Sequence, residues 1–522
     1  MSAALGLDIG TTNVKAVLVD PVGTMVGCTQ RTLQTDRQGT DVEQDASDLW
    51  ARLRDAIAEL TSTHPQVASQ VGAIGVCSQY SSIVPVNARG EPVGPMVMWS
   101  DHRGTDYSWD IMERDENAFM TWIDIHGIPP VGGGLALAHL LFLQHDRPEI
   151  HEATTSYLEP MDYVTARLTG RITATQHSMF MSQLCDNRTL GATGYSSDLV
   201  AMSGIDPDHL PPLIGIDDEV GRLAPAVAAR LGLPATAVVY PGLNDTAALG
   251  TAAGITQPGR GGLAIGTTSV MVDAVAEKKT DLDHEILSMP ALSLEDYLVF
   301  AENGYGGRVI EYMLDQHVYA NDPLADHRTV ELFARLENAL AHTAPGAGGA
   351  LFLPWLGGSL APSANPDMRG GFINLSLETE RVDLVRSVTE GVAHNLAWLL
   401  PHVEAFTGDD IGEFAFVGGA ARSPRWCQVL ADVLDRPIAP AADPDTAVAR
   451  AVARLALARR GELDRAEVDD GVELAARYEP RSERRAMYDM HQEQFEAAFE
   501  ALRPISEALT SFHAAQIQEP AP

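Results

Sequence analysis

Two short runs of apolar residues, at positions 4–9 and 14–19, lie on either side of a Gly-Thr-Thr tip near the start of the chain. Runs of this length around a turn predict a β-hairpin. The arrangement returns in the second half, where residues 261–275 predict another hairpin. The two tips are nearly identical, since Ile9–Val14 reads IGTTNV and Ile265–Val270 reads IGTTSV. This repeat indicates two similar domains, each with its own loop.

The spacing of apolar residues after the first hairpin predicts a helix over residues 45–60. Leu49, Leu53 and Ile57 would share its buried face, and Asp45 is a suitable N-cap. Further strands are expected at 71–77, 82–86, 238–240, 297–301, 351–353 and 414–417, and further helices at 135–145, 157–169, 329–342, 382–407, 424–434, 446–460 and 483–510. Strands that alternate with helices in this way are typical of an α/β fold.

A chain of 522 residues exceeds one ordinary domain, so two domains are expected. The segment 254–262 contains Gly and Pro and few bulky apolar residues, which favours a hinge there. We therefore predict an N-terminal domain at 1–254 and a C-terminal domain at 255–480. A C-terminal helix and tail would occupy 481–522, with the last residues from 518 onward disordered.

Composition and charge narrow the function. The chain is 45% apolar and 20% charged, which is typical of a globular protein, and its formal net charge is −35. Such an acidic chain is a poor partner for nucleic acid, and no apolar run is long enough for a membrane helix. The four cysteines are scattered, and the start of the sequence has no signal-peptide pattern. We expect a cytoplasmic protein with reduced thiols.

The twin tips are the best candidates for nucleotide binding. The sequence has no GxxxxGK[ST] motif and no GxGxxG after a strand, whereas turns rich in Gly and Thr present amides and hydroxyls that suit phosphate. A plain hairpin tip is the alternative for either turn alone. Asp8 interrupts an apolar strand just before the first tip, where an unpaired carboxylate would be costly. Asp8 therefore either approaches Mg²⁺ through its water shell or caps the turn amides.

An ordered set of motifs resembles the FGGY family of carbohydrate kinases over roughly residues 4–460. The motifs are Leu7–Thr12 (LDIGTT), Met98–Arg103 (MWSDHR), Gly242–Ala248 (GLNDTAA), Ile265–Thr268 (IGTT), Phe352–Trp355 (FLPW) with Met368–Gly370 (MRG), and Val417–Arg422 (VGGAAR). The resemblance implies two ribonuclease H-like domains of the actin-like ATPase superfamily, with ATP in the cleft between them. Within the family, the general layout is most similar to that of xylulose kinases.

The resemblance also implies roles for single residues. Asp245 matches the catalytic aspartate, the general base, and it would share the Mg²⁺ site with Asp8. Without the resemblance, a turn aspartate would be the simpler interpretation of Asp245. The residues implied in ATP binding are Gly10, Thr11, Thr12, Gly266, Thr267, Thr268, Gly307, Gly418, Gly419 and Ala420.

The substrate side departs from the family pattern. The residues implied in substrate binding are Gln79, Tyr80, Ser81, Trp99, Asp101, Arg103 and Asn244. Xylulose kinases usually show Gln-Met-His-Gly where this chain has Gln-Tyr-Ser-Ser, and glycerol kinases show Gln-Arg-Glu. Gly358–Pro362 and Ala449–Ala451 also differ from the usual Gly-Glu-Arg and Gly-Ala-Ala. For Asp101 and Arg103 the alternative is an ion pair that braces a loop.

The expected function is therefore ATP- and Mg²⁺-dependent phosphorylation of a hydroxyl on a small ketose, with D-xylulose or a related pentulose as the leading substrate. A kinase for ribulose, a tetritol or glycerol is the alternative within the family. An actin-like ATP switch without a sugar substrate is the alternative outside it. The expected partner is a small sugar or polyol, with neither nucleic acid nor membrane involved, and relatives suggest a homodimer.

Overall fold

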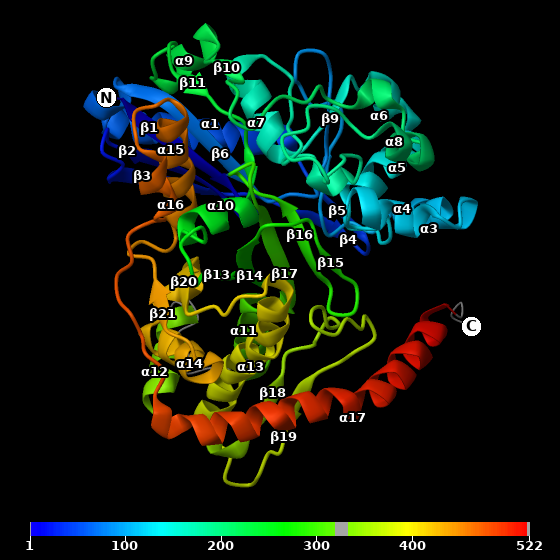
Figure 1. Cartoon of the computed structure of the whole chain (residues 1–522), viewed down its shortest axis with the longest axis vertical. Coiled ribbons are helices and arrows are strands. Elements are labelled where there is room, and N and C mark those ends of the chain that lie inside the picture. Colours follow the sequence, from blue (N-terminus) through cyan, green and yellow to red (C-terminus); the bar gives the residue numbers. More distant parts are fainter. Residues whose placement is uncertain (1, 319–331, 519–522) are drawn as a thin grey trace.

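Two mixed β-sheets with helices on their faces form the two halves of the molecule (Figure 1). The computed structural model of the protein describes residues 2–318 and 332–518. The start of the helix expected at 329–342 and the expected disorder of residues 519–522 lie outside the described residues. Each sheet has seven strands, and both are built on the same plan, which confirms the α/β fold with two similar halves.

The first sheet has the order β10-β11-β6-β1-β2-β3, with β12 also paired to β6. Its strands are β1 (Ala3–Ile9), β2 (Asn13–Val19), β3 (Met25–Thr32), β6 (Val71–Ser78), β10 (Gly221–Arg222), β11 (Val238–Val239) and β12 (Leu243–Asn244). Strands β1 and β2 form the predicted hairpin, β3 continues it antiparallel, and β6 pairs with β1 in parallel.

The second sheet repeats this plan in the order β15-β16-β17-β14-β13-β20-β21. Its strands are β13 (Arg260–Ile265), β14 (Thr268–Val275), β15 (Thr280–Asp281), β16 (Ile286–Pro290), β17 (Tyr297–Tyr305), β20 (Glu413–Val417) and β21 (Ile438–Pro440). The hairpin β13–β14 corresponds to β1–β2, β17 to β3, and the parallel pair β20 and β21 to β6 and β11. The repeated IGTT segment therefore marks a repeated half-molecule.

Smaller ladders and the helices complete the chain. The remaining strands are β4 (Asp36–Gln38), β5 (Asp41–Gln44) and β8 (Met96–Val97), which form one sheet, and the pairs β7 (Val84–Val86) with β9 (Ser156–Leu158) and β18 (Leu351–Leu353) with β19 (Gly371–Ile373). The α-helices are α1 (Ala46–Thr63), α2 (Pro65–Ala68), α3 (Thr105–Arg114), α4 (Ala118–Ile125), α5 (Ala136–Asp146), α6 (Pro148–Ala153), α7 (Pro160–Thr169), α8 (Ser197–Ser203), α9 (Pro225–Leu231), α10 (Asp245–Ala253), α11 (Gly307–Met313), α12 (Leu332–Ala341), α13 (Arg381–Thr407), α14 (Pro424–Leu434), α15 (Ala447–Arg459), α16 (Arg465–Asp469) and α17 (Arg485–Gln518).

Helix α1 shows why these segments fold as they do. The Asp45 carboxylate accepts from the amides of Ser47 and Asp48, as predicted for an N-cap, and the apolar face of α1 is buried against β2 and β3. The expected helix at 157–169 was partly wrong. Tyr157 and its neighbours form strand β9, which pairs with β7, and the helix begins only at Pro160. Proline suits this position because the amides of a first helical turn have no partner within the helix, so its missing N–H costs nothing.

Two helices cross between the halves. Helix α10 follows the first sheet in the sequence but packs against β13, β14 and β20 of the second, and α15 follows the second sheet but lies on β1, β2 and β6 of the first (Figure 1). A Cβ atom on Gly6 would lie 1.9 Å from the carbonyl oxygen of Ala449, and one on Gly75 would lie 2.1 Å from that of Val452. The bare backbone at these glycines lets α15 approach the sheet directly.

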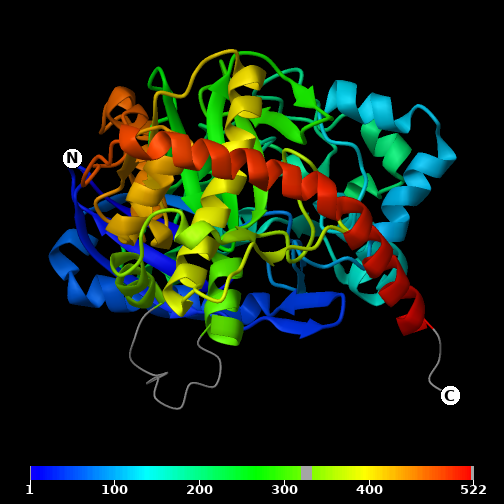
Figure 2. The ribbon, with the colours of Figure 1, turned by 90° about the horizontal axis from the view of Figure 1, so that it is seen from below.

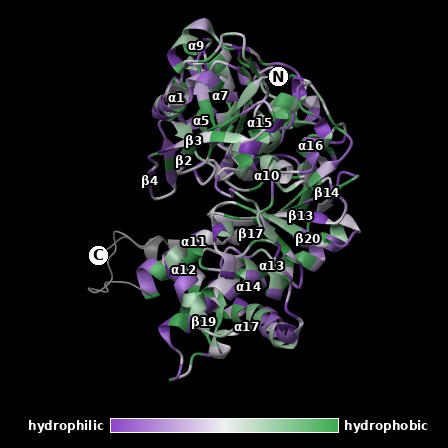
Figure 3. Cartoon of the chain, turned by 90° about the vertical axis from the view of Figure 1, so that its left-hand side faces the viewer, coloured by the Kyte–Doolittle hydropathy of each residue, from purple (hydrophilic) through white to green (hydrophobic). Residues whose placement is uncertain are grey.

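Helix α17 runs along the second half and packs against α13, α14 and β18 (Figure 2). Its Phe495 and Phe499 are fully buried with Leu353 and Trp355. Hydrophobic and hydrophilic residues are interspersed along the helices of both halves (Figure 3). None of the helices within residues 2–318 and 332–518 is both long and apolar enough to cross a membrane.

Candidate active site

The first Gly-Thr-Thr tip is held in place by side chains from elsewhere in the first half. The Gly10 amide donates to the carbonyl of Asn13 at 2.9 Å, which closes the turn. Trp99 Nε1 donates to Thr11 Oγ1 at 3.1 Å, and Gln44 Nε2 donates to the Thr11 carbonyl at 2.7 Å. Thr12 stays exposed at the tip. The loop is therefore rigid at its base and open at its end, where a phosphate could bind.

Asp8 lies on β1 just before this tip. Lys15 on the facing strand places its Nζ 3.7 Å from Asp8 Oδ2, and Cys77 on β6 donates to Asp8 Oδ1 at 3.8 Å. Burial raises the pKa of the Asp8 carboxyl, although the Lys15 ammonium opposes the shift. Lys15 also donates to the carbonyl of Asp445 at 2.8 Å, which links the first hairpin to a segment of the second half.

Asp245 is the first residue of α10, where helix amides and the helix dipole face a carboxylate. Asn244 caps the helix, because its Oδ1 accepts from the Ala247 amide at 2.8 Å. Burial, and then the nearby charge of Asp8, raise the pKa of Asp245 to about 7. Asp8, near the end of β1, and Asp245, directly after β12, thus meet at the carboxyl edge of the first sheet, where ligands of α/β folds commonly bind.

Tyr80 and Thr246 lie next to this pair. The Tyr80 and Thr246 hydroxyls share a hydrogen bond of 3.2 Å. Burial raises the pKa of the Tyr80 hydroxyl, and the charges of Asp245, Glu302 and Glu159 raise it further. Glu302 belongs to β17 of the second sheet, so carboxylates from both halves of the molecule lie close enough to Tyr80 to raise its pKa. The region around Tyr80 is polar and bordered by carboxylates.

The second tip mirrors the first. The Gly266 amide donates to the carbonyl of Thr268 at 2.9 Å, and Gly266 and Thr267 are exposed. Glu302 lies on the neighbouring strand β17, and burial raises the pKa of its carboxyl, although the nearby Thr268 side chain opposes the shift. Gly307 lies against the tip, but its amide donates to the Gly266 carbonyl at 2.8 Å. In this structure Gly307 shapes the tip, and its amide is not directed at a ligand.

The turn Gly418–Ala420 follows β20. Gly418 has a φ of 89°, a left-handed conformation that favours glycine, and a Cβ atom there would meet no atom within 4 Å. The Gly418 amide donates to the carbonyl of Pro444 at 3.1 Å. Because Lys15 contacts the neighbouring Asp445, the turn and the first hairpin are connected through one short segment.

The segment Gln79–Ser82 leads from β6 to Tyr80 and is fixed by a residue that the sequence did not single out. Glu159 is fully buried and accepts from the amides of Ser81 and Ser82, each at 3.1 Å. Ser81 has a φ of 60°, and its hydroxyl donates to the carbonyl of Gly134 at 2.7 Å. The Gln79 Oε1 accepts from Ser82 at 2.9 Å. Ser81 therefore serves the loop, whereas the Tyr80 hydroxyl lies with that of Thr246 next to Asp245.

Asp101 and Arg103 form a brace. Asp101 is fully buried and accepts from the Val42 amide at 2.8 Å and from Arg103 Nε at 2.9 Å. Arg103 also pairs with Glu43 at 2.6 Å and lies over the Phe142 ring at 4.3 Å. These contacts fit the alternative of a loop-bracing ion pair and leave neither charge free for a sugar in this structure.

Comparisons with known proteins agree with this geometry. The models of the N-terminal and C-terminal domains of the FGGY family of carbohydrate kinases match residues 3–250 and 262–459. A xylulose kinase of Bacillus subtilis is 26% identical, with 83% of this chain and 84% of the relative covered. A gluconokinase of the same species is 24% identical, with 83% of each chain covered.

Solved structures give the same result. The crystal structure of a xylulose kinase from Rhodospirillum rubrum matches with a TM-score of 0.81 and 26% identity, over 97% of this chain and 99% of that one. A gluconate kinase from Lactobacillus acidophilus shares the fold, with a TM-score of 0.81 and 19% identity over 96% of this chain and 98% of its own. The chain belongs to the FGGY family of carbohydrate kinases, which phosphorylate an alcohol group of a small sugar with ATP.

Proposed function

We propose that this kinase transfers the γ-phosphate of ATP to a hydroxyl of a neutral ketose, with D-xylulose or a related pentulose as its substrate. The observation that carries the proposal is the position of Asp245. It begins α10 beside Asp8 and the Tyr80–Thr246 hydroxyl pair, and its pKa of about 7 suits a base that works near neutral pH.

Asp245 acts as the general base in this proposal. A sugar hydroxyl placed against its carboxylate gives up its proton as the bond to phosphorus forms, and the new alkoxide character is short-lived. Phosphoryl transfer needs alignment and charge neutralisation more than covalent help from the protein. Asn244 and the first turn of α10 fix the direction of the carboxylate. Tyr80, Gln79, Trp99 and Asn244 line the sugar side, while Asp101 and Arg103 hold the loop that carries Trp99.

The nucleotide lies between the two tips. We assign the β- and γ-phosphates to Gly10–Thr12 and Gly266–Thr268, whose ends are open, and the adenosine to Gly418–Ala420. Gly307 supports the second tip through its bond to Gly266. We propose an N-terminal domain at 1–254, which carries the general base and the sugar-binding side, and a C-terminal domain at 255–480, which carries the second tip and the adenosine-binding turn. Residues 481–522 form the C-terminal helix and tail.

Asp8 and Asp245 fit a magnesium ion. Both are carboxylates, both pKa values are raised by burial, and the charge of Asp8 raises that of Asp245 further. A divalent cation would relieve that repulsion, and carboxylate oxygens with water are the ligands that Mg²⁺ prefers. When bound, it would neutralise charge on the phosphates. The Lys15 ammonium, 3.7 Å from Asp8, offsets part of the negative charge of the two carboxylates.

The charges around the sugar side favour a ketose over a sugar acid. Relatives include gluconokinases as well as xylulose kinases, and gluconate carries a carboxylate. The charges that raise the pKa of Tyr80 are all acidic: Asp245, Glu302 and Glu159. Arg103 is already paired with Asp101 and Glu43. An anionic acceptor would raise the pKa of these buried carboxyl groups still further and would be repelled by each one that is ionised, whereas the hydroxyls of a ketose can donate to them.

A panel of acceptors tests the proposal. ADP release from Mg-ATP is measured with D-xylulose, D-ribulose, a tetritol, glycerol and D-gluconate. We expect the highest kcat/KM with a pentulose. A preference for a tetritol, glycerol or gluconate would overturn the assignment of a pentulose substrate but not that of kinase activity. ADP release that does not depend on any acceptor would favour an actin-like ATP switch and overturn both.

The pH profile of this reaction tests the base. Because Asp245 must lose its proton to act, kcat/KM should rise with pH and then level off. The midpoint should lie at about 7, or below it when a bound cation lowers the pKa of Asp245. Initial rates in buffers of constant ionic strength give the profile. A rate that stays flat between the usual pKa of an aspartate, 3.8, and neutrality would contradict the raised pKa.

Tyr80→Phe tests the sugar side. The change removes the hydroxyl that bonds Thr246 beside Asp245, and one hydrogen bond is worth about 1 kcal/mol, or roughly fivefold. We expect KM for the sugar to rise about fivefold while KM for ATP stays unchanged. Tyr163→Phe is the matched control, because Tyr163 is also buried and donates to the Ala46 carbonyl in the core of the first half. Equal effects of both variants would remove Tyr80 from the sugar site.

Two further proposals concern the setting. An ATP-dependent sugar kinase works where ATP is abundant, so we place the protein in the cytoplasm, where its four free cysteines would stay reduced. The homodimer expected from relatives stays a prediction, and light scattering, which measures the molar mass in solution, would test it.

A further inference from the structure

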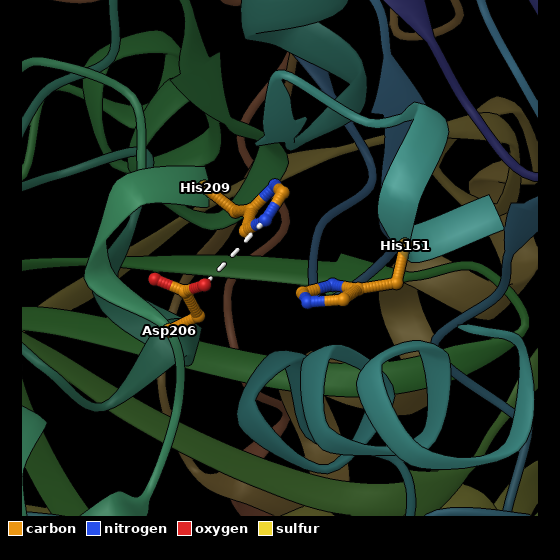
Figure 4. Close-up of side chains that lie close together, drawn as sticks. All are labelled: His151, Asp206 and His209. Carbon is orange, nitrogen blue, oxygen red and sulfur yellow. Dashed lines mark ion pairs between the residues drawn. The ribbon is translucent and has the colours of Figure 1, made fainter. Parts of the chain in front are cut away.

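We infer that His151, Asp206 and His209 form a binding site for one divalent transition-metal ion, best suited to Zn²⁺, outside the kinase active site. The three side chains offer ligand atoms that all lie within 4.8 Å of one another. Within residues 2–318 and 332–518, this is the one group of three or more such side chains with that spacing. Figure 4 shows that they face a common space.

The three residues come from two separate segments of the first half. His151 lies on α6, whereas Asp206 caps the short 3-10 helix Pro207–His209 and His209 is its last residue. Both segments are attached to the same core, because the Asp206 amide donates to Gln144 on α5 at 2.9 Å. A metal ion would therefore join α6 to the segment after α8. The sequence pattern alone could not reveal the site, since its residues are far apart in the chain.

The distance between His209 and Asp206 is informative. His209 Nε2 lies 3.7 Å from Asp206 Oδ2, which is longer than a hydrogen bond. Two ligands at about 2.1 Å from a tetrahedral zinc ion are about 3.4 Å apart. Asp206 Oδ1 already accepts from the Asp208 amide at 3.0 Å, so the carboxylate is oriented and Oδ2 is left for a ligand. The spacing suits a bridging cation better than a direct pair.

His151 is oriented by a buried neighbour. Its Nδ1 is hydrogen-bonded to the Tyr157 hydroxyl at 2.7 Å, and Tyr157 is fully buried on β9. When Nδ1 carries the proton, Nε2 keeps its lone pair for a metal, and such outer partners are usual for metal-bound histidines. The rings of His151 and His209 lie 4.2 Å apart, centroid to centroid. Two imidazoles and one carboxylate match zinc, with a fourth position left for water.

Exposure allows an ion to enter. The Asp206 side chain is 44% exposed and that of His209 is 16% exposed, so the space opens to solvent on one side. The strongly acidic chain also attracts cations. Helix α6 precedes β9, whose next residue is Glu159, the carboxylate that holds Ser81 and Ser82. The ion would thus stabilise the outer layer behind the sugar side without touching the reaction.

The test is zinc binding by calorimetry, with Co²⁺ as a spectroscopic probe, on the full untagged chain freed of metal. We expect one Zn²⁺ per chain, visible absorption bands of tetrahedral Co²⁺, and a higher Tm with zinc. His151→Ala and His209→Ala should abolish all three. Tyr157→Phe, which removes only the outer partner, should weaken zinc binding about 10- to 100-fold.

His402→Ala is the matched control, because His402 and His284 form another close histidine pair, with rings 4.0 Å apart beside Asp281. It should bind zinc as the unmodified chain does. Absence of binding by the unmodified chain, equal binding by His209→Ala, or loss of binding only in His402→Ala would each overturn the inference. Sugar-kinase activity measured without zinc checks that each variant is folded.

Discussion

Asp245→Asn is expected to lower kcat by about 10³-fold, within the range of about 10²- to 10⁴-fold that a general base contributes. The amide keeps the shape of the side chain but cannot take the proton of the sugar hydroxyl. Nucleotide binding should be largely kept, because the two tips and the Gly418 turn are untouched. Coupled ADP release and direct ATP titration measure the two effects separately.

Stability gives the control for this variant. Because the pKa of Asp245 is raised from 3.8 to about 7, its ionisation lowers stability progressively as the pH rises from 3.8 to 7, and the full cost is present above 7. Asn has no such cost, so Asp245→Asn should raise Tm above pH 7 and leave it nearly unchanged below the usual pKa of an aspartate. A variant that loses activity together with Tm above pH 7 has lost folding instead, and turnover at the unmodified rate would remove Asp245 as the base.

Gly6→Val is expected to prevent the normal docking of α15 on the first sheet. Even a single Cβ atom at Gly6 would lie 1.9 Å from the Ala449 carbonyl oxygen, and this neighbour is backbone that no rotamer change can move. Overpacking in a core typically costs about 1–3 kcal/mol, and a clash with a helix backbone should exceed that range. Thermal unfolding and the yield of folded protein measure the effect.

Gly194→Ala is the matched control for this variant, because a Cβ atom there would meet nothing within 4 Å and its φ is not left-handed. Gly75→Ala should lower Tm in the same way, because its Cβ atom would lie 2.1 Å from the Val452 carbonyl oxygen. An unchanged Tm in Gly6→Val would mean that α15 does not lie this close to β1.

The sequence predicted the repeated hairpins, the capped helix α1 and most later elements, because these depend on local periodicity and turn chemistry. It also placed Asp8 and Asp245 together, through the resemblance. Glu302 was missed, although it interrupts the apolar strand β17 in the same way as Asp8 interrupts β1. Reasoning about unpaired carboxylates in strands could have found it.

Other features depend on contacts between distant segments and have no local signal. Glu159 acts on Ser81 from 78 residues away, and the brace of Asp101 includes the amide of Val42. The packing of α15 on the first sheet could not be predicted from its helical pattern, which is the same whichever sheet it covers. The Gly307 amide is used by the Gly266 carbonyl, a contact for which the sequence has no local signal.

The crossing of α10 and α15 has a consequence for synthesis of the protein. A ribosome that has released residues 1–254 has made every strand of the first sheet, but one face of that sheet waits for α15, which ends at Arg459. Until then the glycine-lined face of β1 and β6 is uncovered, and α10 has no second sheet to cover. Neither half is therefore expected to fold to completion on its own, and a chain truncated after residue 254 should yield an aggregating product rather than a stable domain.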